Sequence, residues 1–201
     1  MIYIVGIGPG SKEYILPKAT ETLTKSDIII GFSRAINSIE HIKGEKIVVQ
    51  KLGEILEIMG SRKKDTISIV ASGDPGFYGI SDYMKKNVSD EIIEIIPGIS
   101  SFQYMMSKIQ MSWQDAFLGS VHGRYEDFIN VVKNNKVSIF LTDYKNSPRD
   151  LARQLFSEGI ECNIWVGENL SYDDERIIKG KPEEIKEIDF SGLSVFVVEV
   201  Y

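Results

Sequence analysis

The sequence predicts an α/β protein of two domains, the first with a mostly parallel sheet and the second with a mixed sheet. Short runs of β-branched apolar residues alternate with segments that favour helices, as in chains that build parallel sheets. Glycine and proline mark the loops that follow several of these runs. The length of 201 residues exceeds the roughly 150 residues typical of one domain. Hydrophobic residues at 43% and charged residues at 26% are typical of an ordinary globular protein.

The first half repeats a strand followed by a helix. Residues 2–7 (IYIVGI) are an uninterrupted apolar run that ends in glycines, which favours a strand buried on both faces. The alternation continues to about residue 108, and such βαβ succession is typical of parallel pairing. The expected strands are 2–7, 27–31, 46–49, 66–71 and 92–96, and the expected helices are 17–25, 33–40, 53–63, 79–87 and 99–108.

Residues 110–115 (QMSWQD) interrupt this alternation, so the domains are expected to be 1–112 and 113–201. Near the end of the second half, strands follow one another with only the short charged segment 182–187 between them, which predicts partly antiparallel pairing. The expected strands are 116–121, 137–142, 161–167, 174–179 and 194–200, with helices at 125–134 and 147–157.

The composition excludes several classes of function. Lys and Arg number 23 against 29 Asp and Glu, a net charge of −6, which argues against nucleic acid as a partner. Cys162 is the one cysteine, and the two histidines, His41 and His122, lie far apart in sequence, so no metal bound by the protein is expected. Neither a signal peptide nor an apolar run of membrane-spanning length is evident. These features predict a cytoplasmic protein without a membrane partner.

The first glycine-rich loop contains Gly6, Gly8, Pro9 and Gly10. It fits the dinucleotide-binding fingerprint poorly, because Ser11 stands where a glycine is required and Pro9 removes a backbone N–H. Two interpretations stay open: a tight turn between strand and helix, or a loop that lets a ligand approach the backbone.

The second loop, residues 72–79 (SGDPGFYG), again follows an expected parallel strand. Asp74 could accept hydrogen bonds from a ligand, and Phe77 and Tyr78 offer aromatic surface. The alternative is an Asx-turn before Pro75 with both aromatic rings packed in the core.

A third loop, residues 97–101 (PGISS), opens a helix, where Ser100 and Ser101 could cap the helix or bind a ligand. Since ligands of open α/β sheets bind at the carboxyl ends of the strands, the three loops together predict a pocket. In the second half, His122 and Arg124 follow a strand and could bind an anion or exchange protons. The segments 141–143 (LTD) and 168–171 (ENLS) place polar groups after two further strands.

The combination of GIGPGS near residue 6, ASGDPGFYG near 71 and PGISS near 97 resembles the tetrapyrrole methylases, which are S-adenosylmethionine-dependent. The resemblance covers essentially the whole chain. Within the family, HGR at 122–124, LTD at 141–143, and ENLS followed by Glu175-Arg176 look most like the members that methylate C5 of cobalt-precorrin-7.

The resemblance implies two α/β domains with a cleft between them, a homodimer, S-adenosylmethionine as methyl donor and a cobalt-precorrin as substrate. It implies donor contacts by Gly73, Asp74, Phe77, Tyr78, Gly79, Ser100, Ser101, Leu141 and Thr142. It implies substrate contacts by Gly8, Pro9, Gly10, His122 and Arg124. The role of Glu168 stays open, and a separate protein is expected to carry out C15 methylation and decarboxylation.

The substrate's carboxylates require local positive charge despite the acidic total. The candidates are Lys12, Arg34, Arg124 and Arg149. Two other functions stay open: methylation of another corrinoid position or of a modified histidine, as by diphthine synthase, and donor binding without catalysis in a regulatory module.

Overall fold

The computed structural model describes residues 1–88, 93–123 and 126–201. The chain forms two compact units, Met1–Ser100 and Ser101–Tyr201. In the described residues, no helix combines the length and apolar character that a membrane span requires.

The first unit is built on a five-stranded parallel sheet of order β3-β2-β4-β1-β5. The strands are β1 (Ile2–Gly6), β2 (Ile28–Phe32), β3 (Glu45–Val49), β4 (Ile67–Ala71) and β5 (Ile93–Ile96). The helices are α1 (Pro17–Thr24), α2 (Ser33–Ser38), α3 (Leu52–Ser61) and α4 (Ser81–Asn87), with a short 3₁₀ helix, η1 (Lys12–Tyr14). The predicted parallel sheet is confirmed.

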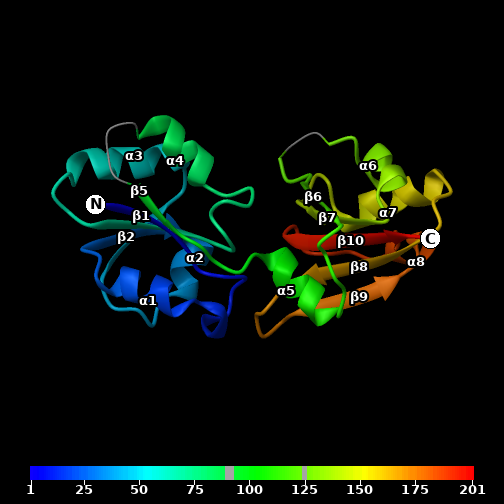
Figure 1. The fold of residues 1–201 in the computed structure, drawn as a ribbon, viewed down its shortest axis with the longest axis horizontal. Coiled ribbons are helices and arrows are strands. Elements are labelled where there is room, and N and C mark those ends of the chain that lie inside the picture. Colours follow the sequence, from blue (N-terminus) through cyan, green and yellow to red (C-terminus); the bar gives the residue numbers. More distant parts are fainter. Residues whose placement is uncertain (89–92, 124–125) are drawn as a thin grey trace. The chain divides into compact units, whose positions relative to one another are not determined.

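Helices cover both faces of this sheet (Figure 1). On one face, Leu23 of α1 and Ile36 of α2 pack against Val5 and Val70 of the central strands. On the other face, Ile55 of α3 and Met84 of α4 join a second apolar cluster. Because side chains alternate between the faces of a strand, the apolar runs of β1, β2 and β4 supply both clusters.

The second unit has a five-stranded mixed sheet of order β6-β7-β10-β8-β9. Its strands are β6 (Phe117–Ser120), β7 (Val137–Leu141), β8 (Cys162–Glu168), β9 (Arg176–Gly180) and β10 (Ser194–Val200). β6 and β7 are parallel, whereas β10 runs antiparallel to β7 and β8, and β9 runs antiparallel to β8. Its helices are α5 (Ser101–Lys108), α6 (Phe128–Asn134), α7 (Pro148–Ser157) and α8 (Pro182–Ile185).

The core of the second unit forms where α6, α7 and α8 cover the sheet. Phe128, Leu151 and Ile185, from the three helices, pack with Phe140 and Phe196 of β7 and β10. The segment 182–187, expected only as a charged connection, contains α8. Pro182 at the first helical position is favourable there, and Ile185 anchors the turn in the core.

The boundary between the units differs from the expected one at 112/113, because α5 belongs to the second unit. This helix contacts β7 and β10. A Cβ atom on Gly167 of β8 would lie 2.5 Å from Met105 Sδ, so the helix packs closely on the strand where glycine leaves room. The helix therefore packs as a layer of the second unit, although it continues the strand–helix alternation of the first.

Candidate functional site

The loops after β1 and β4 are joined at the carboxyl edge of the first sheet. Gly73 N–H donates to the Gly8 carbonyl at 2.7 Å, and Gly8 N–H donates to the Gly73 carbonyl at 3.3 Å. The two strands are adjacent and parallel, and the chain leaves them toward helices that pack on opposite faces. Such an edge is typical of ligand binding in open α/β sheets.

Asp74 connects the second loop to the third. Its Oδ1 accepts from Gly76 N–H at 2.8 Å, and its Oδ2 accepts from Gly98 N–H at 3.0 Å. The Asx-turn considered as an alternative is thus present, and the same carboxylate also holds the loop after β5. Since an ionised carboxylate has about four acceptor positions, Asp74 retains capacity for a ligand.

Glycines allow the three loops to touch through their backbones. A Cβ on Gly98 would lie 2.2 Å from the Gly73 carbonyl oxygen, and a Cβ on Gly6 would lie 2.7 Å from Gly98 N. Real Cβ atoms do not approach backbone atoms so closely. The glycine-rich sequence is therefore explained in part by contacts between the loops themselves.

The aromatic pair of the second loop is Phe77 and Tyr78, whose ring centroids lie 5.0 Å apart in an edge-to-face arrangement. Phe77 is half-buried, but Tyr78 is 40% exposed, so the alternative in which both rings fill the core is wrong for Tyr78. Its φ of 51° lies in the left-handed region that few non-glycine residues adopt. A Cβ on Gly79 would lie 2.4 Å from the Pro75 carbonyl oxygen, which requires glycine there.

The remaining site candidates of the first unit lie in the same loops. Gly8, Pro9 and Gly10 are buried, and Ser100 is also buried. Two basic candidates follow strands at this edge: Lys12 begins η1 beyond the first loop, and Arg34 lies in α2 directly after β2. Both side chains are exposed.

In the second unit, Asp143 organises the loops that follow β6 and β7. Its Oδ2 accepts from Gly123 N–H at 2.6 Å, and its Oδ1 accepts from the N–H groups of Lys145 and Asn146 at 2.8 and 2.7 Å. The same carboxylate lies 3.9 Å from His122 Nδ1. Burial opposes ionisation of Asp143, but the three backbone donors and His122 outweigh it and lower its pKa.

Replacing Asp143 with Asn is therefore expected to make stability less sensitive to acid. Because the folded-state pKa is lowered, the stabilisation is present above the ordinary value of 3.8 and is lost as the pH falls through the folded value. Denaturant unfolding at several pH values from about 6 down to 3 measures the free energy of unfolding of parent and variant. The gap between the two values should close as the pH falls. The exposed Asp173→Asn serves as the control, and a gap independent of pH would contradict the assignment.

Leu141 and Thr142 are the expected contacts of the methyl donor in this unit; Leu141 is the last residue of β7, and Thr142 follows it. The Thr142 hydroxyl donates to the Ser194 carbonyl at 2.9 Å, and its backbone N–H donates to the same oxygen at 3.1 Å. These two hydrogen bonds join the end of β7 to β10. Thr142 is buried, whereas Leu141 is half-buried.

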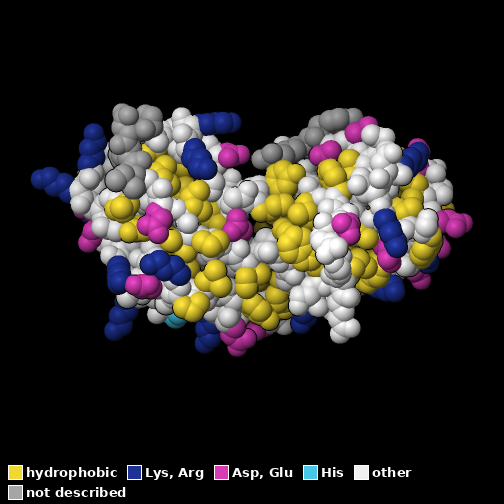
Figure 2. Space-filling model, in the orientation of Figure 1, with side chains coloured by type: hydrophobic (Ala, Val, Ile, Leu, Met, Phe, Trp, Pro, Cys, Tyr) yellow, Lys and Arg dark blue, Asp and Glu magenta, His cyan; other side chains and the backbone are white. Residues whose placement is uncertain are grey.

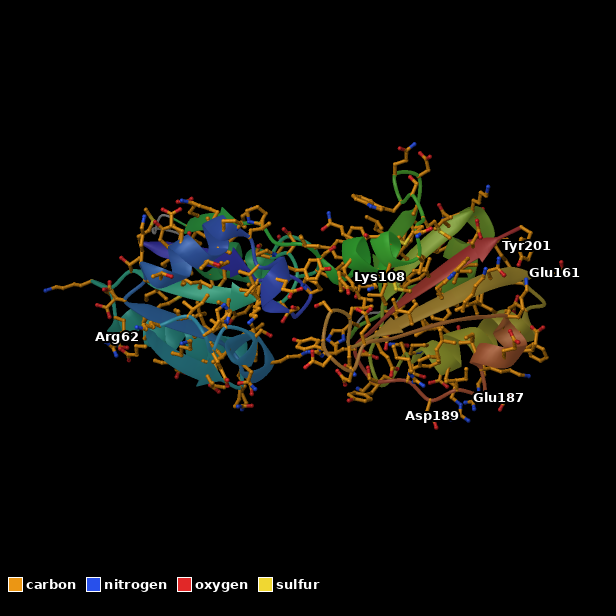
Figure 3. All side chains as sticks on the ribbon, turned by 90° about the horizontal axis from the view of Figure 1, so that it is seen from below. Arg62, Lys108, Glu161, Glu187, Asp189 and Tyr201 are labelled. Carbon is orange, nitrogen blue, oxygen red and sulfur yellow. The ribbon has the colours of Figure 1, made fainter. Side chains whose placement is uncertain are left out.

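The second unit holds two of the basic residues considered as substrate contacts, Arg149 and Arg124. Arg149 of α7 donates to Asp189 at 2.5 Å and to the Lys186 carbonyl at 3.2 Å, so its guanidinium holds the segment after α8, and its role as a substrate contact stays a prediction. The Asp189 side chain points outward from the unit (Figure 3). Arg124 lies outside the described residues.

Glu168, whose role the sequence left open, forms a bidentate ion pair with Arg176. The pair joins Nε to Oε1 at 2.9 Å and Nη2 to Oε2 at 3.0 Å, and Ser191 N–H also donates to Oε2 at 3.0 Å. The Arg176 guanidinium further donates to the Asp189 carbonyl at 2.8 Å and lies 5.3 Å from the centre of the Phe190 ring. Glu168 therefore fixes the segment 189–191 to the paired ends of β8 and β9.

A second polar cluster fixes α5, the helix that begins at Ser101. Glu175 binds Lys108 Nζ at 3.2 Å and accepts from Ser171 N–H at 2.7 Å; Lys108 is labelled on α5 in Figure 3. Glu175 also forms a hydrogen bond with the hydroxyl of Tyr104. Burial has the larger effect on Tyr104 and this carboxylate the next largest, and together they raise its pKa to about 12. In the sequence Glu175 stands out only as part of a motif, because its partners on α5 are distant in sequence.

The surface charges are mixed. On the face drawn in Figure 2, basic and acidic side chains are interspersed over each unit. Within the described ranges, no three His, Cys, Asp or Glu side chains are grouped so that they could hold a metal ion.

The comparison with protein families decides the classification. Residues 1–186 match the family described as tetrapyrrole (corrin/porphyrin) methylases. The chain belongs to this family. The match spans the glycine-rich loops of the first unit and the loops after β6 and β7.

Individual relatives place the methylase more narrowly. It is 37% identical to a probable cobalt-precorrin-7 C(5)-methyltransferase of Methanocaldococcus jannaschii, over 99% of this chain and 98% of that protein. It is 34% identical to the cobalt-precorrin-7 C(5)-methyltransferase of Salmonella typhimurium, over 88% and 89% of the two chains. A diphthine synthase of Saccharolobus solfataricus is 28% identical over 98% and 92%.

Among solved structures, the methylase resembles the precorrin-6Y methylase of Archaeoglobus fulgidus with a TM-score of 0.80 and 22% identity, covering 100% of this chain and 98% of the other. A uroporphyrin-III C-methyltransferase from Thermus thermophilus, solved with S-adenosylhomocysteine, gives a TM-score of 0.81 at 20% identity, covering 98% and 91%. At these identities the structures support the fold, which confirms the expected tetrapyrrole methylase architecture.

Proposed function

We propose that this methylase transfers the methyl group of S-adenosylmethionine to C5 of cobalt-precorrin-7 in cobalamin biosynthesis. The observation that carries the proposal is the 37% identity over almost the full length of both chains with the Methanocaldococcus jannaschii C(5)-methyltransferase. The diphthine synthase relative is less similar, at 28%, so the corrinoid is preferred as acceptor.

The donor would bind at loops that the structure presents at strand ends. In the first unit the proposed contacts are Gly73, Asp74, Phe77, Tyr78, Gly79 and Ser100. In the second unit they are Ser101, Leu141 and Thr142. The first set suits a cation that carries adenosine. Asp74 offers a carboxylate with spare acceptor positions, and Phe77 and Tyr78 offer aromatic surface. The glycines let a ligand come close to the backbone. The left-handed Tyr78 supports this placement, because backbone strain is concentrated at functional loops.

The substrate would contact Gly8, Pro9 and Gly10 of the first unit and His122 and Arg124 of the second. Lys12 and Arg34, exposed at the carboxyl edge of the first sheet, are the proposed partners of its carboxylates. Charge-assisted hydrogen bonds from such side chains would offset the acidic net charge locally.

The donor supplies a methyl group already activated on a sulfonium. The chain's own task is to hold the acceptor carbon in line with it and to exclude water. The network of Gly8, Gly73, Asp74 and Gly98 suits this task, because backbone hydrogen bonds and the Asp74 carboxylate fix the three loops to one another.

The test is an acceptor comparison. The purified chain is incubated with S-adenosylmethionine and either a cobalt-precorrin mixture or the elongation factor that diphthine synthases modify, and products are followed by mass spectrometry. We expect a gain of one methyl group by the corrinoid only. Methylation of the elongation factor alone would reverse the preference, and donor binding without any product would favour the regulatory module.

Two further properties are part of the proposal. We propose a homodimer, which sedimentation of the purified chain would test. We also propose that a separate protein performs the C15 methylation and decarboxylation.

A further inference from the structure

C-methylation requires a proton acceptor in addition to the residues that bind the donor and the substrate. The methyl group replaces a hydrogen on the acceptor carbon, so one proton must leave for each methyl transferred. A positioned side chain that accepts this proton accelerates such a step by about 100-fold or more.

His122 is the candidate that the structure favours. Its backbone is held because its N–H donates to Ser120 Oγ at 3.2 Å, while the preceding Val121 carbonyl accepts from the Asn146 side chain at 2.8 Å. Its imidazole is 57% exposed and is therefore accessible to a substrate. A neutral imidazole is a common proton acceptor in enzymes.

Asp143 gives this histidine an electrostatic partner. Its Oδ2 lies 3.9 Å from His122 Nδ1, which is beyond a hydrogen bond but within ion-pair distance, so the attraction becomes favourable when the ring gains a proton. Backbone hydrogen bonds fix this carboxylate, and its lowered pKa keeps it ionised. Asp143 also directly follows Thr142, a proposed donor contact, which places the pair beside the proposed reaction site of this unit.

We propose that His122 accepts the proton lost from C5 and that Asp143 positions and stabilises the resulting imidazolium. The proposal rests on the proposed function. In the balanced step, a π electron pair of the ring forms the bond from C5 to the methyl carbon, and the methyl–sulfur electron pair stays on sulfur. The C5–H proton then passes to a ring nitrogen of His122, and the electrons of that bond restore the conjugation of the corrinoid.

The test compares His122→Ala and the larger His122→Gln with the control His41→Ala, which replaces the other, exposed histidine. Calorimetry with S-adenosylhomocysteine and thermal unfolding establish that each variant binds the spent donor and folds. Single turnovers are followed by the absorbance of the final corrinoid, with hydrogen or deuterium at C5.

We expect both His122 variants to retain donor affinity and to form the final chromophore about 100-fold more slowly. Their deuterium isotope effect should exceed that of the parent, and added imidazole should restore part of the rate to His122→Ala. His41→Ala should match the parent. For the positioning residue, Asp143→Asn should slow the same step less than the His122 variants do and respond little to imidazole, because the ring is still present.

An unchanged rate in the His122 variants would overturn the inference alone. So would a slower rate with neither a larger isotope effect nor imidazole rescue, which would leave His122 as a substrate contact. If the unaltered chain methylates no corrinoid at C5, the proposed function itself fails, and this inference fails with it.

Discussion

Replacing Gly98 with Ala is expected to destabilise the first unit by about 3 kcal/mol, because the added methyl group must displace backbone rather than side chains. The new Cβ would lie 2.2 Å from the Gly73 carbonyl oxygen and 2.9 Å from the Gly6 carbonyl carbon. All three loops at the carboxyl edge of the first sheet would shift. Since a displacement of about 1 Å can cost about 100-fold in rate, methyl transfer should fall by that order.

The matched control is Gly60→Ala in α3, where a Cβ would meet no atom within 4 Å. This substitution should stabilise the helix by about 0.5–1 kcal/mol and leave transfer unchanged. Denaturant unfolding, calorimetry with S-adenosylhomocysteine and a methyl-transfer assay measure the three consequences. A Gly98→Ala variant with parental stability and donor affinity would contradict the proposed role of the loop contacts.

Replacing Glu168 with Ala is expected to destabilise the second unit by about 2–3 kcal/mol, because the residue makes three charge-assisted hydrogen bonds while only 8% exposed. The penalty is below that of a fully buried pair, since the Arg176 side chain is 44% exposed and can be hydrated after the loss. Ser191 would lose the acceptor for its backbone N–H.

Glu158→Ala is the control, since its ion pair with Lys133 has both side chains about half exposed and should contribute less than about 1 kcal/mol. Chemical unfolding of both variants measures the difference. If Glu168→Ala lost activity while keeping parental stability, Glu168 would act on the substrate rather than hold the fold.

The sequence predicts the strands of the first unit well, because apolar runs such as 2–7 and 66–71 need no knowledge of their neighbours. It also locates the three glycine-rich loops. It does not reveal that Gly73 and Gly98 touch, because that contact depends on β1 lying between β4 and β5. Periodicity within one strand carries no information about strand order.

The other contacts that the sequence does not predict join residues that are far apart along the chain. Arg149 is one of several basic residues in the sequence, and only the fold shows that Asp189 binds it. Glu168 and Arg176 are neighbours because of the register between β8 and β9. The assignment of α5 to the second unit depends on Met105 reaching Gly167, two residues that no local pattern connects.

This tetrapyrrole methylase is proposed to add a methyl group to C5 of cobalt-precorrin-7. The most direct measurement uses S-adenosylmethionine labelled with ¹³C in the transferred methyl, purified cobalt-precorrin-7 and NMR of the product. The proposal predicts one labelled methyl group whose long-range couplings assign it to C5. A labelled methyl on any other carbon, or no labelled product, would contradict it.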